Sequence, residues 1–84
     1  MERRDRVEIT AEILRLARRG AKKTNLVYRA NLNHAILELY LSRLEQLGLI
    51  ARNGCPERRI QTTEKGMQFV ERYANLQAMA HFTI

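Results

Sequence analysis

Apolar residues recur every three or four positions in three stretches of the first half of the chain, a spacing that predicts amphipathic helices. We expect these helices over residues 5–19, 24–30 and 34–47. The expected inward side chains are Ile9, Ile13, Leu16 and Ala17 in the first helix, Leu26, Val27 and Ala30 in the second, and Ile36, Leu37, Tyr40, Leu41, Leu44 and Leu47 in the third. The polar side of the third helix carries His34, Glu38, Ser42, Glu45 and Gln46.

The residues that border these stretches suit helix ends. Gly20 suits the C-terminal end of the first helix, because glycine readily takes a left-handed conformation. Thr24 and Asn33 are expected as N-caps of the second and third helices, since their side-chain oxygens can accept hydrogen bonds from free backbone N–H groups. The turn at residues 31–33 is short. Two helices joined by such a turn, the second longer, form the outline of a helix-turn-helix.

The pattern changes in the second half of the chain. Residues 49–52 and 59–62 are expected as short strands joined by the turn-forming segment 53–56. Thr63 is expected to cap a last helix over residues 64–82, along which Met67, Val70, Tyr73, Ala74 and Leu76 are periodic. The order is therefore helix, helix, helix, hairpin, helix. It predicts a mainly α winged helix-turn-helix with three helices, a two-stranded wing and a C-terminal helix.

Length and composition favour a single domain over residues 1–84. A chain this short buries only about 60% of its unfolded surface, so association with another chain would help to stabilise it. No apolar stretch approaches the roughly 18 residues of a membrane span, and the polar N-terminus is unlike a signal peptide. We therefore expect a cytoplasmic protein, associated with the nucleoid, and no membrane partner.

Charge favours an anionic partner, because the chain has 15 Lys and Arg against 9 Asp and Glu. Residues 1–30 hold nine basic and four acidic residues, residues 31–50 hold one and two, and residues 51–84 hold five and three. The positive charge thus flanks the third helix and does not lie on it.

Groups suited to catalysis or metal binding are sparse. Cys55 is the only cysteine, which excludes an internal disulfide, and it has no fixed histidine partner for nucleophilic catalysis. His34 and His81 lie far apart and lack neighbouring carboxylate or thiol ligands. There is no glycine-rich phosphate loop. We expect no enzyme activity, no metal and no cofactor.

Several short pieces of the chain resemble one family, the archaeal ten-kilodalton winged-helix DNA-binding proteins and their relatives among predicted regulators. The matching pieces are Ile13-Leu14, Ala17-Arg18-Arg19-Gly20, Lys23-Thr24, Ala30-Asn31-Leu32-Asn33, Tyr40-Leu41, Gly48-Leu49-Ile50 and Thr63-Glu64-Lys65-Gly66. Their joint order and spacing over residues 5–75 are more specific than any single piece. The resemblance implies a dimeric DNA-binding protein, with the third helix at the major groove and the wing beside it.

The candidate DNA contacts fall into three groups. The first connection contributes Arg18, Arg19, Lys22, Lys23 and Thr24. The third helix and the turn before it contribute Asn31, Asn33, His34 and Glu38. The wing contributes Arg52, Arg58 and Arg59. Basic side chains suit phosphate contacts or a minor groove, although an ordinary solvated surface carries similar charge. Asparagine can pair with adenine, and glutamate can accept from the cytosine amino group.

Some of these residues have simpler explanations. Capping alone explains Asn33, and a turn explains Asn31 as well as a base contact does. Glu38 and Glu45 repel phosphate, so they either discriminate between sequences or mark a helix that does not insert deeply. Arg3, Arg4 and Arg6 could form a flexible arm that reaches a groove, although charged termini are common. Tyr28, Tyr40 and Tyr73 are expected in the core or at its rim, because they share helical spacing with apolar residues.

The end of the last helix is apolar and predicts an interface, because exposed apolar patches usually mark contact surfaces. We expect a homodimer whose interface includes Val70, Tyr73, Leu76, Met79, Ala80 and Phe82. In the resembling family this helix commonly extends into a long antiparallel coiled coil. With Ile84 as the last residue, we expect that extension to be short here or replaced by another contact. The alternative is a tail that folds back over the first helix and completes the core of a monomer.

These observations together predict a homodimer that binds double-stranded DNA, as a transcriptional regulator or a chromatin-associated protein. Two alternatives stay open at this point. One is a protein-interaction module, which the acidic third helix would allow, and the other is an RNA-binding winged helix.

Overall fold

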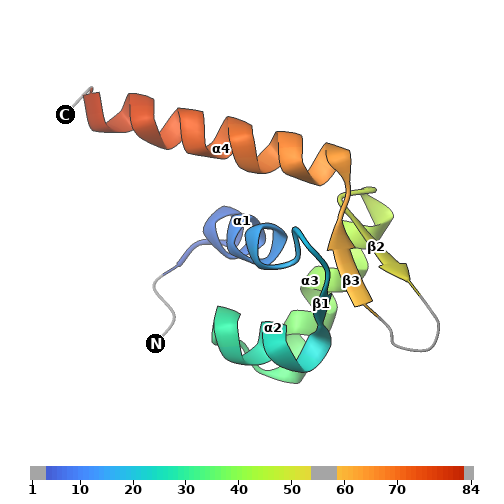
Figure 1. The fold of residues 1–84 in the computed structure, drawn as a ribbon. Coiled ribbons are helices and arrows are strands. Elements are labelled where there is room, and N and C mark those ends of the chain that lie inside the picture. The colour runs from blue at the N-terminus through green and yellow to red at the C-terminus, as the bar shows by residue number, and fades with distance from the viewer. Residues whose placement is uncertain (1–3, 54–58, 83–84) are drawn as a thin grey trace.

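The structure is a computed structural model, and it describes residues 4–53 and 59–82. Its elements follow in the order α1 (Arg6–Leu16), β1 (Ala21–Lys22), α2 (Lys23–Ala30), α3 (His34–Gln46), β2 (Ile50–Asn53), β3 (Arg59–Thr62) and α4 (Glu64–Phe82). Figure 1 shows α1, α2 and α3 gathered in one cluster, with the small sheet beside them and α4 crossing over α1. Cys55 and Arg58, which the sequence singled out, lie outside the described residues.

Two helices begin at the caps that the sequence predicts. The side chain of Asn33 accepts a hydrogen bond of 2.8 Å from the backbone N–H of Ile36 at the start of α3. At the start of α4, the hydroxyl of Thr63 accepts one of 3.1 Å from the N–H of Gly66. Each oxygen satisfies an N–H group that has no partner within its own helix.

The N-cap predicted at Thr24 is wrong. The helix α2 begins at Lys23, with Lys22 in the N-cap position, and Thr24 lies within the first turn. The reason is tertiary: residues 21 and 22 form the strand β1, which pairs with β3, and the chain passes from this strand into the helix without a separate cap.

The end predicted for the first helix is also wrong. The helix α1 stops at Leu16, with Ala17 as its C-cap, whereas the sequence predicted helix through residue 19 and a cap at Gly20. Gly20 has φ +88 and lies in the turn after the helix, where its N–H donates to the carbonyl of Ala17 at 3.1 Å. This left-handed conformation suits glycine and turns the chain towards β1.

The sheet has three antiparallel strands in the order β1-β3-β2, where the sequence predicted only the hairpin of β2 and β3. Ala21 pairs with Ile60, and Arg52 pairs with the same Ile60 from the other side. The sheet is tied to the end of α1, because Thr62 donates its hydroxyl hydrogen to the carbonyl of Leu14 and its N–H to the carbonyl of Ala17.

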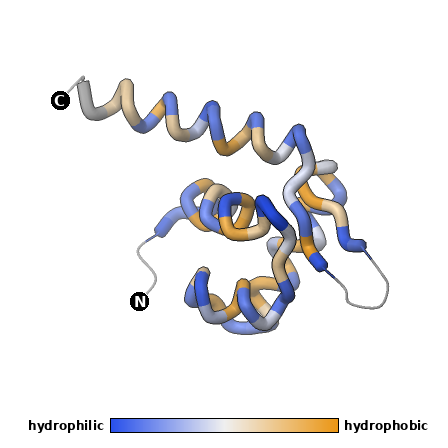
Figure 2. Tube along the Cα trace, viewed as in Figure 1, coloured by the Kyte–Doolittle hydropathy of each residue, from blue (hydrophilic) through white to orange (hydrophobic). Residues whose placement is uncertain are grey.

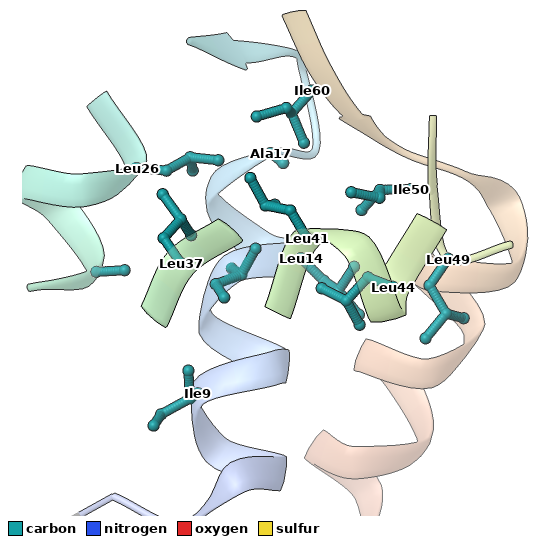
Figure 3. Packing of buried hydrophobic residues seen from close by; sticks show 12 residues of the cluster. Ile9, Leu14, Ala17, Leu26, Leu37, Leu41, Leu44, Leu49, Ile50 and Ile60 are labelled. Carbon is teal, nitrogen blue, oxygen red and sulfur yellow. The ribbon is translucent and has the colours of Figure 1, made fainter. Parts of the chain in front are cut away.

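The core lies where the first three helices meet the sheet (Figures 2 and 3). Its buried side chains are Ile9, Ile13, Leu14, Ala17, Leu26, Ala30, Leu37, Leu41, Leu44, Leu49, Ile50 and Ile60. The inward faces predicted from the periodicity are confirmed for the most part. Ile36 and Leu47 are exceptions, because they lie at the edges of the α3 stripe and are exposed.

Tyr28 does not take the core or rim position that the sequence predicted, since 82% of its surface is exposed. Tyr40 and Tyr73 are half-buried, as expected. Leu26 and Ala30 supply the buried face of α2, and Tyr28 projects from its other side.

The first half of α4 packs onto the domain, with Phe69 and Val70 against the core. The second half extends past it along α1 (Figure 1), and there Leu76 and Met79 each have 64% of their surface exposed. The tail thus partly follows the alternative in which it covers the first helix, yet keeps an apolar face open. None of the helices in the described ranges is long and apolar enough to cross a membrane.

Candidate nucleic-acid interface

The turn between α2 and α3 is held by the conformation of Asn31, which is left-handed with φ 56 and ψ 50. The following N–H, from Leu32, donates back to the carbonyl of Val27 at 3.1 Å. Asparagine tolerates this conformation better than most residues, so the turn role that the sequence considered is present. The side chain of Asn31 is exposed as well, and stays a candidate for contact with a ligand.

The outer face of α3 is open to solvent. Leu37, Leu41 and Leu44 bury one side of the helix, while the exposed positions opposite them are Ala35, Leu39, Ser42 and Gln46. His34 is exposed at the first turn. Leu39 was missed by the sequence analysis, although 59% of its surface is exposed. The sequence contained a signal for this exposure. Leu39 lies two positions after Leu37 and two before Leu41, so it does not share the face on which residues three and four apart are buried.

Glu38 lies on the flank of this face and is held by two cations from other elements. One carboxylate oxygen lies 3.0 Å from the Nζ of Lys23 on α2, and the other lies 3.1 Å from an Nη of Arg52 on β2. Arg52 also approaches Glu45, with 3.4 Å between its Nε and a carboxylate oxygen. The helix α3, the wing and the start of α2 are thus joined by ion pairs.

These contacts shape the electrostatics of the α3 flank. The hydrogen bond from Lys23 is the largest cause that lowers the pKa of Glu38 from its ordinary value of 4.5. Burial opposes it as the second-largest cause, and the hydrogen bond and charge of Arg52 then lower the pKa further. The Nε of Arg52 is buried and has no hydrogen-bond partner among the residues that the structure describes. Its approach to Glu45 satisfies the distance of an ion pair but not the geometry of a hydrogen bond, so we regard Glu38 as the main partner of Arg52.

The sheet brings together two basic groups that are separate in the sequence. Lys22 of β1 is paired with Arg59 of β3, and Arg59 faces Asn53 of β2 on its other side. The Arg59 side chain passes over Gly20, at the connection that carries the exposed Arg18 and Arg19. Arg52 is paired with Ile60, so the two side chains share one face of the sheet. Arg59 is next to Ile60 on β3 and therefore points to the opposite face, because successive side chains of a strand alternate. Arg52 reaches α3, whereas Arg59 is exposed.

Arg4 is not a loose arm. Its guanidinium donates a hydrogen bond of 2.7 Å to the carbonyl of Ala30, the last residue of α2. A cation at this position complements the negative end of the helix dipole. The contact holds the N-terminal segment beside the turn that leads into α3.

In the described part of the chain there is no group of three or more His, Cys, Asp or Glu side chains suited to hold a metal ion. The α3 face itself offers charged, hydrogen-bonding and apolar side chains, among them Glu38, His34 and Leu39.

A family model described as winged helix-turn-helix matches residues 3–81 of the chain. Among solved structures, the chain is similar to Sso10a-2, a DNA-binding protein from Sulfolobus solfataricus, with TM-score 0.76 and 25% identity over 95% of this chain and 88% of that one. No protein matches in a search of curated sequences. The family match and this neighbour confirm the predicted architecture and the resemblance to the archaeal ten-kilodalton winged-helix DNA-binding proteins.

Two bacterial regulators share the fold. A transcriptional regulator of the MarR family from Rhodococcus sp. RHA1 has TM-score 0.75 and 22% identity, over 86% of this chain and 56% of that one. The multiple antibiotic-resistance repressor of Listeria monocytogenes has TM-score 0.73 and 15% identity, over 89% and 57%. The chain thus spans little more than half the length of these regulators, and the likeness concerns the fold alone.

Proposed function

This chain belongs to the winged helix-turn-helix family, and on that premise we propose that it binds double-stranded DNA through α3 and the basic residues around it. The observation that carries the proposal is the arrangement of charge at the α3 face. Lys23 and Arg52 approach one flank of α3 from two other elements, and the exposed Arg18 and Arg19 lie in the connection before β1. A duplex needs cations in this position to meet its phosphates while a helix enters the major groove.

Two layers of contact follow from this arrangement. Lys22 and Arg59 contact phosphates and set affinity, whereas Asn31, His34 and the outward residues of α3 meet base edges. Asn33 is engaged as the cap of α3, and its role is to place the helix. Support for the partner comes from Sso10a-2, which is itself a DNA-binding protein.

The proposal includes a homodimer formed through the outer half of α4. Leu76 and Met79 are its centre because both are exposed, and Ala80 and Phe82 follow in the sequence. Tyr73 and Val70 take part only at the edge, since both are half-buried. A hollow lined by Val7, Leu49, Phe69 and Leu76 runs beside α4 and could receive the partner's helix. Two copies related by a two-fold axis would present two α3 helices to one duplex, in the role of a regulator or a nucleoid-associated protein.

The test compares a random-sequence DNA duplex with an RNA duplex of equal length, over a range of salt concentrations. Log affinity for DNA should fall linearly with log salt, with a slope of about −0.9 for each phosphate that is neutralised. The single variants Lys22→Ala and Arg59→Ala should each reduce both the affinity and the slope. Their matched control is Arg15→Ala on α1, where the arginine pairs with Glu12 at 2.8 Å and is expected to make no DNA contact.

One observation favours a second candidate, a protein-docking role for α3. The α3 face and its flank combine Glu38 and Glu45 with the exposed Leu39, and these carboxylates would complement a basic patch on a protein partner. Absence of binding to either duplex at low salt would leave this candidate in place of the first. Stronger binding to the RNA duplex at matched salt would point to an RNA-binding winged helix.

A further inference from the structure

Lys23 and Arg52 converge on the two oxygens of a single carboxylate. The Lys23 Nζ lies 3.0 Å from Oε2 of Glu38. One Nη of Arg52 lies 3.1 Å from Oε1 and donates a hydrogen bond of 3.4 Å to Oε2, so it contacts both oxygens. Together with Ile60, these three side chains line a small hollow between α2, α3 and the sheet. Two cations from separate elements are thus arranged around one bidentate anion.

A DNA phosphate offers the same kind of bidentate acceptor. Its two free oxygens accept charge-assisted hydrogen bonds from arginine and lysine, in the way that the two oxygens of a carboxylate do. The Glu38 carboxylate therefore occupies the position, relative to Lys23 and Arg52, that a backbone phosphate would take.

We propose that Glu38 is an internal competitor of DNA phosphate: it holds Lys23 and Arg52 in the free protein and makes tight binding depend on the sequence of the duplex. The inference rests on the proposed DNA-binding function and adds a device that controls it. A duplex binds fully only when its phosphates take over the two cations, and Glu38 is then left on α3 at the groove.

The sequence dependence comes from the carboxylate that is left behind. An ionised carboxylate only accepts hydrogen bonds, and leaving it desolvated beside phosphates is costly. The amino groups of cytosine and adenine are the donors that base edges present in the major groove. A duplex that places such an amino group opposite Glu38 gives the carboxylate a new hydrogen-bond donor and offsets the cost of losing Lys23 and Arg52. Other duplexes leave that cost in place and bind more weakly.

Solvent exposure keeps the exchange reversible. The side chains of Lys23, Glu38 and Arg52 are 38%, 41% and 24% exposed, so these ion pairs are partly solvated and weak. Glu45 does not replace Glu38, because it meets only the Arg52 Nε, at 3.4 Å and without hydrogen-bond geometry. The other possible role of these ion pairs is to orient the wing. Removing the charge of Glu38 should raise the affinity for DNA if Glu38 competes with phosphate, and lower it if Glu38 orients the wing.

The test replaces Glu38 with glutamine in the full chain and measures binding to a pool of random-sequence duplexes over a range of salt. The matched control is Glu12→Gln, which removes the same charge from an ion pair on α1. We expect Glu38→Gln to bind the pool several-fold more tightly than Glu12→Gln. Its salt slope should steepen by about 0.9 for each additional phosphate neutralised. The spread of affinities between individual duplexes should narrow.

A second variant identifies the released donor. In Lys23→Gln, Glu38→Gln the gain in affinity should largely disappear, because one of the two cations that Glu38 held is gone. Urea unfolding of each variant, measured alongside, confirms that the compared proteins are folded.

The outcomes separate the two proposals. If the parent binds DNA and Glu38→Gln binds no more tightly than Glu12→Gln, the competitor role is overturned and the DNA-binding function stands. Weaker binding by Glu38→Gln would assign the network to wing orientation. If neither the parent nor any variant binds a duplex at low salt, the proposed function fails, and the competitor role fails with it.

Discussion

Gly66 of α4 lies against the backbone carbonyl of Leu49, so close that a β-carbon on residue 66 would overlap the oxygen and the methyl group of Thr62. The same segment makes two hydrogen bonds to the residues that follow α3. Thr63 donates its hydroxyl hydrogen to the carbonyl of Gly48 at 2.6 Å, and Lys65 donates to the carbonyl of Leu47 at 2.9 Å. Residues 63–66 therefore fix the direction in which α4, the proposed dimer helix, leaves the domain.

Gly66→Ala should destabilise the protein by about 1–3 kcal/mol, the usual cost of overpacking. Helix propensity acts in the opposite sense, because alanine is favoured over glycine by about 1 kcal/mol in a helix interior. A lower free energy of unfolding for Gly66→Ala, measured in urea, would therefore show that the close contact with Leu49 outweighs the gain in helix propensity. A more stable Ala variant would mean that α4 can move away from Leu49 at little cost.

Leu39 should read the methyl group of thymine, because it is an exposed apolar side chain on the outer face of α3. Replacing every thymine of a duplex by uracil removes these methyl groups and leaves the base-pairing groups unchanged. The parent should lose roughly fourfold in affinity for each methyl group contacted, which corresponds to about 0.8 kcal/mol of apolar burial. Leu39→Ala should bind the two duplexes equally.

Leu47→Ala is the control for this comparison, because Leu47 is similarly exposed, at 57%, but lies at the C-cap of α3. It should keep the parent's preference for thymine. Loss of that preference in Leu47→Ala, or its survival in Leu39→Ala, would contradict the assignment.

Acid should remove the stabilisation that Glu38 provides. Its carboxyl pKa in the folded protein lies below the ordinary value of 4.5, chiefly because Lys23 and Arg52 favour the charged form. A lowered folded pKa means stability that is present above pH 4.5 and is lost as the pH falls from there through the folded pKa. The difference in unfolding free energy between the parent and Glu38→Gln should therefore shrink on acidification. A difference that is constant from neutral pH to about pH 3 would show that the ion pairs add nothing to stability.

Association should depend on the exposed face of the outer half of α4. Sedimentation at micromolar concentration should show a dimer for the parent and a monomer for Leu76→Glu, Met79→Glu, because charge on both residues opposes apolar burial. Ala74→Glu adds charge at an exposed position about 160° around the helix from Leu76 and about 140° from Met79, and should remain dimeric. Truncation after Asn75 should also give a monomer. A parent that sediments as a monomer would rule the dimer out.

The sequence by itself determined the elements whose signals are local. Helical periodicity reveals a buried face because residues three and four apart share it, and the caps at Asn33 and Thr63 act within one turn of their helices. The short turn before α3 and the clustering of basic residues on either side of it were visible for the same reason. The family resemblance followed from the order of these local features.

Only the tertiary structure decided which distant residues meet. The strand β1 has two residues, too few for a periodic signal, and exists because it pairs with β3. That pairing moved the start of α2 to Lys23, away from the cap expected at Thr24. Tyr28, expected in the core or at its rim, is exposed, because Leu26 and Ala30 supply the buried face of α2.

The contacts of Glu38 were beyond local patterns altogether. Its partners Lys23 and Arg52 stand on two other elements, on either side of it in the chain. Whether an acidic side chain on α3 repels phosphate or holds the cations that would bind phosphate depends on how α2 and the wing cross α3. The packing of the core sets how these elements cross. The spacing of residues along the chain therefore does not predict which side chains meet Glu38.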